Sequence, residues 1–450
     1  MTSLNTKQRF LIGLTLFSMF FGAGNLIFPP FLGALAGEST LTAMGGFALT
    51  AVCFPVLAVI VVARTGGLDT LASRVHPGFA FLFTLLIYLS IGPCLAIPRT
   101  ASTSFEMAVK PFFTGEGAMV GTLMGFPLDL VAQAIYSVFF FALAYVIALN
   151  PEKLTQRLGK VMSPTLIALI VILFVSCLIN PLGGYGNVLP PYDVNAFTRG
   201  FVEGYQTLDT IAALNFGLII ALNIQAMGVK STKGVVSETI KAGLIAGVLL
   251  ITIYIALAHV GATASGAGIM TENGAQTLTA VADRQFGAIG LIILGAIFFL
   301  ACLNVCVGLL SCCSNYFKNT FPILSYRGWL TVFALCSVVV ANAGLTMILK
   351  LSIPVLLAIY PVAIVLIVLG LVHPWIARFP MIYPVSIVLT ALTGIVSALL
   401  QVGVPLPHFK DFIEMLPLAS VGLEWIAPAA LGAVIGMLIS AFGRNAKMAN

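Results

Sequence analysis

The first long apolar run of the chain, residues 10–35, contains residues that a membrane helix ordinarily avoids. Within its FFGAGNLIFPPF stretch, two glycines weaken a helix, and Pro29 and Pro30 remove backbone donors and exclude the turn before them. An unwound segment at membrane depth is tolerated only where protein covers it or where it lines a watery cavity. One explanation is a proline kink with close glycine packing. We favour a discontinuous helix whose freed backbone groups bind an ion and a substrate.

Apolar runs of membrane-spanning length recur along the chain. Hydrophobic residues make up 60% of the 450 residues and charged residues 8%, against a usual charged share of about a quarter. We therefore predict an all-α polytopic membrane protein, with the lipid bilayer as its surroundings and about twelve transmembrane helices. The third span should be interrupted at Gly92-Pro93 and at Pro98-Arg99. The spans are expected at residues 10–34, 41–63, 78–108, 127–149, 161–180, 199–226, 239–265, 286–316, 328–343, 345–371, 381–402 and 425–442.

The lysines and arginines predict the orientation. If the N-terminus is cytoplasmic, most of these 21 residues lie on inner flanks, including Lys153, Arg157 and Lys160 in one loop. This bias places both termini in the cytoplasm. Because the basic residues are spread over short loops, the net charge of +6 gives no indication of nucleic-acid binding. Six basic residues lie on outer flanks or within spans: Arg99, Lys110, Arg199, Arg284, Lys350 and Lys410.

The sixth span carries a second polar interruption, GFVEGYQTLD, which ends at Asp209. A carboxylate at membrane depth is costly and is normally paired, protonated or bound to a cation. Asp209 could simply cap the inner half-helix. We favour a role in binding a cation or the substrate. A cation, the substrate ammonium, or a polar network with Asn25 and Tyr205 could offset the cost of the charge.

The first and sixth spans are therefore both interrupted, and the two halves of the chain start five spans apart. This spacing is the expected mark of two inverted five-helix repeats with a binding site at their interface. We expect a first repeat at residues 1–180 (spans one to five) and a second at 181–372 (spans six to ten). Residues 373–450 should form two additional C-terminal spans.

Five motifs in this order resemble those of the bacterial branched-chain amino acid:cation symporters. They are FGAGNLIFPP, PRTASTSFE, FVEGYQTLD, ACLNVCVGL and SIPVLLAIYP, and they extend over nearly the whole chain. The resemblance implies sodium-driven uptake of leucine, isoleucine and valine across the bacterial inner (plasma) membrane. It also implies a ten-helix inverted-repeat core with two extra helices, and no cofactor other than Na⁺ as coupling ion.

The chemistry of an amino acid matches the two interruptions. The N-terminus of a half-helix offers free N–H groups and a positive dipole end for the carboxylate. Carbonyl groups freed in span six can accept from the ammonium, and an apolar pocket between spans one, three, six and eight should hold the side chain. The three substrates should be poorly separated there. The candidate substrate-binding residues are Gly22, Ala23, Gly24, Asn25, Gly204, Tyr205, Thr207 and Asp209.

The candidate sodium ligands are Phe21, Asn25 and Asn304, because a sodium ion in this type of fold usually bridges spans one and eight. Members of the family tend to carry a threonine where this chain has Val305. Coupling to protons through Asp209 or Glu106, or a broader range of neutral amino acids, therefore remains the alternative. An intramembrane enzyme is not expected, because the chain shows no nucleophile–base set and no HExxH motif.

Overall fold

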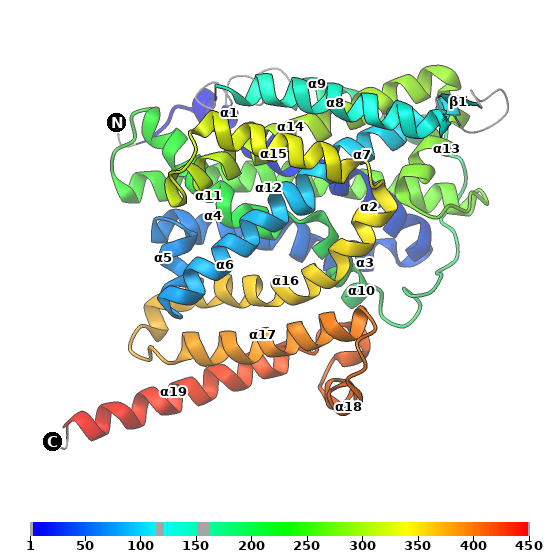
Figure 1. The fold of residues 1–450 in the computed structure, drawn as a ribbon. Coiled ribbons are helices and arrows are strands. Elements are labelled where there is room, and N and C mark those ends of the chain that lie inside the picture. Colours follow the sequence, from blue (N-terminus) through cyan, green and yellow to red (C-terminus); the bar gives the residue numbers. More distant parts are fainter. Residues whose placement is uncertain (1–2, 114–120, 124, 151–162, 449–450) are drawn as a thin grey trace.

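The structure is a computed structural model that describes residues 3–113, 121–123, 125–150 and 163–448. Lys153, Arg157 and Lys160 of the predicted inner loop lie outside the described residues. The described chain is almost entirely helical (Figure 1). Its only strands, within these ranges, are β1 (Thr122–Leu123) and β2 (Phe126–Pro127), which pair antiparallel.

The first predicted span consists of two helices, α1 (Thr6–Phe20) and α2 (Ala23–Ala36). The helix breaks at Phe21 and Gly22, whose ψ angles of 95° and −155° are extended rather than helical. The discontinuous first span is thus confirmed. The expectation that the prolines exclude the turn before them is wrong, because Pro29 and Pro30 lie inside α2 and the helix continues through both.

The sixth span is also broken, as predicted. Helix α10 (Ala196–Glu203) passes into the short 3₁₀ helix η7 (Gly204–Thr207), and α11 (Asp209–Ala226) follows. Between them Leu208 adopts a left-handed conformation with φ of 69°. This conformation is uncommon for a residue with a branched side chain, and it lets the chain change direction directly before Asp209.

The third span is interrupted once rather than twice. Helix α6 (Pro77–Leu89) is followed by a π-helical turn, η3 (Ser90–Cys94), in which Gly92 has a ψ of −129°. The second interruption, expected at Pro98-Arg99, is wrong because α7 (Ala96–Ala108) is continuous there. Pro98 is the third residue of that helix, where its missing N–H has no intrahelical partner to lose.

Helices occupy each of the twelve predicted spans, the fifth of them within its described part, from residue 163 onward. The remaining span helices are α3 (Thr40–Ala48), the π-helical η2 (Leu49–Cys53), α4 (Phe54–Thr65), α8 (Leu128–Ala148), α9 (Ser163–Ile179), α12 (Thr232–Gly266), α14 (Ala288–Thr320), α15 (Tyr326–Ala341), α16 (Leu345–Ile376), α17 (Ile382–Gln401) and α19 (Ile426–Met448). The connecting helices are η1 (Gly37–Ser39), α5 (Leu68–Ala72), η4 (Lys110–Phe113), α13 (Gly274–Phe286), α18 (Pro407–Met415) and η8 (Ala419–Val421). By length and composition, eight helical stretches in the described ranges could each cross a membrane.

The broken helices lie in the interior of the bundle. Helix α2 packs on α12, and α11 packs on α4, while α7 packs on α14. The C-terminal helices α17 and α19 lie along one side, next to α16, and α8 and α9 lie along the opposite side (Figure 1). The division into two inverted repeats and a C-terminal pair stays a prediction.

Candidate functional site

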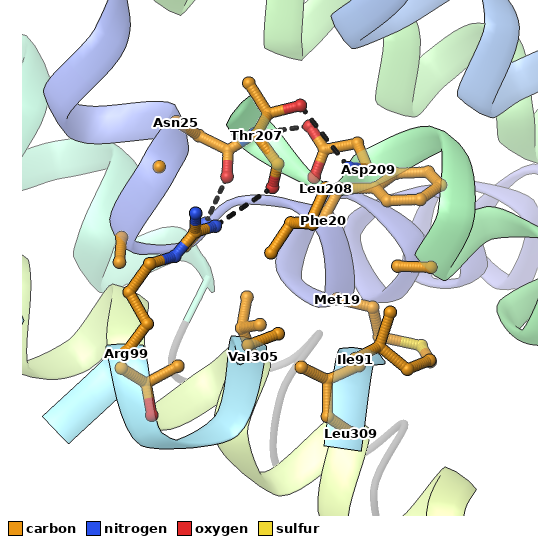
Figure 2. Close-up of a pocket in the computed structure, with 16 residues that line it drawn as sticks. Met19, Phe20, Asn25, Ile91, Arg99, Thr207, Leu208, Asp209, Val305 and Leu309 are labelled. Carbon is orange, nitrogen blue, oxygen red and sulfur yellow. Dashed lines mark hydrogen bonds between the residues drawn. The ribbon is translucent and has the colours of Figure 1, made fainter. Parts of the chain in front are cut away.

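A small cavity lies where the two broken helices meet (Figure 2). Its volume is about 20 Å³, which is room for about one water molecule. Elements of the first, third, sixth and eighth spans enclose it, and these are the four spans expected to surround the substrate. The lining residues are Met19, Phe20, Gly22, Ala23, Gly24, Asn25, Ile91, Ala96, Arg99, Thr100, Thr207, Leu208, Asp209, Ala212, Val305 and Leu309.

The break in the first span presents two helix ends to this region. The last intrahelical bond of α1 joins the Phe21 N–H to the Phe17 carbonyl at 2.8 Å, and the first bond of α2 joins the Leu26 N–H to the Gly22 carbonyl at 3.2 Å. The carbonyls that end α1 and the first N–H groups of α2, at residues 23–25, therefore have no partner within their own helices. The C-terminal end of α1 therefore favours a cation, and the N-terminal end of α2 favours an anion.

Asn25 and Asp209 join the two breaks through their side chains. The Asn25 Oδ1 accepts from the Gly22 N–H at 3.0 Å, and its Nδ2 donates to Asp209 Oδ2 at 2.5 Å and to the Tyr254 hydroxyl. The Tyr254 hydroxyl, from α12, also donates to Asp209 Oδ2 at 3.2 Å. Asp209 is 3% exposed, so the protein holds this buried carboxylate through neutral donors of two other helices.

The hydrogen bonds around Asp209 test its expected partners and its possible role as a helix cap. The predicted contact between Asp209 and Asn25 is confirmed. Tyr205 is not the tyrosine of the network, because its ring stacks on Tyr360 with centroids 4.5 Å apart while Tyr254 reaches Asp209. A role of Asp209 as a cap alone is disfavoured, since the donors to its carboxylate come from outside α11.

Arg99 extends from α7 to the break in the sixth span. Its Nη1 donates to the Gln206 carbonyl at 2.8 Å and its Nη2 donates to the Thr207 carbonyl at 3.3 Å. Figure 2 shows the guanidinium pointing from α7 toward Thr207. The side chain is buried, being 4% exposed. It therefore satisfies two of the carbonyls that the unwound segment leaves without helical partners.

Much of the apolar wall of the cavity comes from α14. Val305 lies so close to Gly22 that a Cβ added to this glycine would be 2.7 Å from the valine Cγ2. Leu309 continues the wall one turn further on, and Met19 and Ile91 complete it. Where a threonine hydroxyl is expected in the family, this chain presents a methyl group to the break in the first span.

The predicted site residues fall into two groups. Six of the eight candidate substrate residues line the cavity, whereas Gly204 packs against Thr50 and Tyr205 against Tyr360. Of the candidate sodium ligands, Asn25 lines the cavity, but Phe21 and Asn304 do not. The Asn304 amide is fully buried, and within the described residues neither of its polar atoms has a hydrogen-bond partner. The roles of all these residues remain predictions.

Sequence reasoning gave no site role to Arg99 or Tyr254. Arg99 had a weak signal, as an arginine inside an apolar span, and the structure shows that it binds carbonyls of the unwound segment. Tyr254 had none, because a tyrosine in an apolar run is ordinary and its partner Asp209 lies 45 residues away.

Comparison with known proteins identifies the family. The sequence profile described as "Branched-chain amino acid transport protein" matches residues 5–443 of the chain. The chain belongs to the branched-chain amino acid transport protein family. This membership confirms the resemblance seen in the motifs and the expectation of a membrane transporter rather than an enzyme.

Curated members of this transport family are similar over their full length. The chain is 38% identical to the branched-chain amino acid permease BraB of Bacillus subtilis, covering 100% of this chain and 99% of the relative. It is 39% identical to the permease BrnQ of the same organism, covering 96% of each protein. The branched-chain amino acid transport system 2 carrier protein of Pseudomonas aeruginosa is 38% identical, with 97% of each covered.

Solved structures of Mhp1, a nucleobase-cation-symport-1 family transporter, show a similar fold. The closed conformation superposes with a TM-score of 0.59 at 13% sequence identity, covering 96% of this chain and 92% of the other. The inward-facing conformation gives 0.55 at 14% identity, covering 96% and 91%. The all-helical polytopic membrane fold is thus confirmed.

Proposed function

We propose that this family member imports leucine, isoleucine and valine by alternating access, coupled to sodium. The observation that carries the proposal is the convergence of two broken helices on one enclosed cavity, in a chain of the branched-chain amino acid transport family. Discontinuous helices whose ends meet near the bilayer midplane are the usual site of substrate and coupling ion in secondary transporters.

The two charged groups of the amino acid have separate partners. The carboxylate binds the N–H groups that open α2, where Gly22 and Gly24 leave the backbone accessible. The carbonyls of Gln206 and Thr207 already accept from Arg99. We therefore assign the ammonium to the carboxylate of Asp209, which is hydrogen-bonded to Asn25. An opposite charge offsets the cost of burying this acid.

The apolar wall of Met19, Ile91, Val305 and Leu309 suits a branched aliphatic side chain. Such a wall has no group that prefers one of the three substrates, since one methylene changes binding by about 1–3 kcal/mol. Polar amino acids are rejected because their side chains would lose hydrogen bonds to water without replacement.

The size of the cavity indicates a closed state. A space of about 20 Å³ accommodates a water molecule but not an amino acid. The substrate therefore requires movement of the wall that α14 and η3 supply, or of the half-helices themselves. Such a rearrangement is what alternating access between the two faces of the membrane demands.

We place sodium beside the C-terminal end of α1. Unpaired carbonyls and the negative end of the helix dipole favour a cation there, and Phe21, Asn25 and Asn304 are the candidate ligands. The unpartnered Asn304 amide supports this assignment. The alternative of proton coupling rests on Asp209, because Glu106 pairs with Lys110 at 2.6 Å and does not line the cavity.

Equilibrium binding of labelled leucine to the purified transporter tests the substrate assignment. We expect saturable binding that excess isoleucine and valine displace, and that lysine and aspartate do not. Replacing sodium by potassium at constant ionic strength should weaken the binding. Failure of isoleucine and valine to displace leucine would refute a shared pocket.

A further inference from the structure

Arg99 is a buried cation that makes no ion pair within the described residues, although Asp209, which lines the same cavity, acts on it electrostatically. In the part of the chain that the structure describes, no carboxylate oxygen lies within 4.0 Å of its guanidinium. Its two hydrogen bonds go to neutral carbonyls. A charged group at membrane depth is expensive and normally pairs with an opposite charge or binds one.

The Arg99 guanidinium has more N–H donors than the two that bind carbonyl groups. It carries five N–H groups in a planar fork, and the Gln206 and Thr207 carbonyls take two of them. The fork is suited to binding a carboxylate with two parallel hydrogen bonds. Arg99 also lines the cavity, so an anion in the cavity would find these donors on its wall.

A second set of donors lies next to Arg99. A Cβ added to Gly24 would be 3.1 Å from Arg99 Nη2, which places the guanidinium against the first turn of α2. The N–H groups of this turn have no partner within the helix. The positive end of the α2 dipole and the fixed positive charge therefore meet on one side of the cavity, while the acidic Asp209 is bound to Asn25.

We propose that Arg99 binds the α-carboxylate of the substrate together with the N-terminus of α2, and so restricts transport to ligands with a free carboxylate. This inference rests on the proposed function and adds the residue that recognises the carboxylate end of the substrate. While it binds the carboxylate, Arg99 keeps its bonds to the carbonyls of η7. The bound carboxylate therefore connects the two broken helices through one side chain.

A purely structural role makes a different prediction. If Arg99 only stabilises the unwound carbonyls, its removal disturbs the site as a whole, and ligands with and without a carboxylate lose affinity together. If Arg99 also binds the carboxylate, ligands that have one lose more affinity than ligands that lack it. The ratio of two affinities therefore distinguishes the two roles where a single affinity does not.

Leucine and leucinol form a suitable pair of ligands, because they share the side chain and the ammonium and differ in the carboxylate. Their binding to purified wild-type protein should differ by at least about 100-fold, since a site built for hydrogen bonding rejects an analogue that lacks the partner. In Arg99→Gln, leucine should lose at least about tenfold more affinity than leucinol does.

Arg199→Gln provides the matched control. Arg199 lies on α10, pairs with Glu203 at 3.2 Å and does not line the cavity. Its substitution removes the same charge near the same broken span, and it should leave the leucine-to-leucinol ratio at the wild-type value.

If Arg99→Gln does not fold, the leucine-to-leucinol affinity ratio is measured in Arg99→Lys instead. A single ammonium cannot serve two carbonyls and a carboxylate in the fork geometry, so the ratio should fall at least about tenfold. An unchanged ratio in the folded Arg99 variant, or an equal loss for both ligands, would overturn the inference. A wild-type protein that binds no leucine would instead refute the proposed function itself.

Discussion

Asp209 shows how a costly residue can be retained inside a membrane protein. Its carboxylate is buried, and its hydrogen bonds come from Asn25 on α2 and Tyr254 on α12. Neutral donors reduce the cost of the charge without cancelling it. The remaining free energy is available to a cation or an ammonium that enters the site, which is how a residue harmful to stability can serve transport.

Asp209→Asn should lower leucine uptake more than tenfold while changing the thermal unfolding temperature little. The amide can still accept from Asn25 and Tyr254, but it offers no charge to the ligand. A raised sodium requirement would assign Asp209 to the ion, and a flattened pH dependence would assign it to a proton. Asp283→Asn, on α13, is the control. Uptake with unchanged affinity, sodium and pH dependence would return Asp209 to a structural role.

Gly24 is the position where we expect the backbone and the ligand to meet. An added Cβ would lie 3.1 Å from the Thr207 Cα and 3.2 Å from the Gln206 carbonyl oxygen. We expect Gly24→Leu to insert and fold but to abolish leucine binding, because the side chain fills the cavity. Gly45→Leu, at an exposed glycine of α3, should bind normally. Binding by Gly24→Leu at the wild-type level would show that the glycine serves packing alone.

Val305 faces the break in the first span with methyl groups where the resemblance to the family led us to expect a hydroxyl. Val305→Thr keeps the shape of the side chain and adds one oxygen beside the α1–α2 break. We expect the sodium concentration for half-maximal leucine uptake to fall at least about threefold, since sodium prefers oxygen ligands. Val305→Ala, which adds no oxygen, should not produce this fall. An unchanged sodium requirement in Val305→Thr would place the ion away from α14.

At the scale of elements, both helix breaks follow from their residues, but the details depend on packing. The sequence predicts a break near FGAGN, and the structure has it at Phe21 and Gly22. Pro29 and Pro30 do not end α2, because neighbouring helices and close glycine contacts support the helix around them. Pro98 lies in the first turn of α7 rather than at an interruption.

Partners from distant helices could not be predicted in the same way. Arg99 and Gln206 are 107 residues apart, and Asn25 and Tyr254 are 229 apart. Periodicity places a residue on a face of its own helix but does not say which helix faces it. The site residues nearest to the breaks were therefore accessible to sequence reasoning, and those that reach in from α7 and α12 were not.

Close packing between α2 and α12 gives a prediction about stability. A Cβ added to Gly33 would lie 2.8 Å from the Ala258 carbonyl carbon, in a position that backbone atoms already occupy. Gly33→Val should therefore push the helices apart and cost roughly 1–3 kcal/mol or more, measured as a lower unfolding temperature in detergent. Gly45→Val should be nearly neutral. An equally stable Gly33→Val protein would mean that α2 moves freely relative to α12.

At the scale of the whole molecule, the charged and polar groups of the site lie in the interior. Helices that are long and apolar enough to cross a membrane surround them. The core helices place the two breaks face to face, while α17 packs at one side against α16 and α19 packs against α17. The closed cavity and the Mhp1-like fold are consistent with a protein that exposes one central site alternately to either face.

Uptake of labelled leucine into proteoliposomes is the most direct test of this account. With an inward sodium gradient we expect saturable accumulation above equilibrium that isoleucine and valine inhibit. Dissipating the gradient with a sodium ionophore should reduce uptake to equilibration. Accumulation that ignores sodium and follows an imposed proton gradient would contradict sodium coupling. Uptake that neither saturates nor responds to isoleucine and valine would contradict a single central site for branched-chain amino acids.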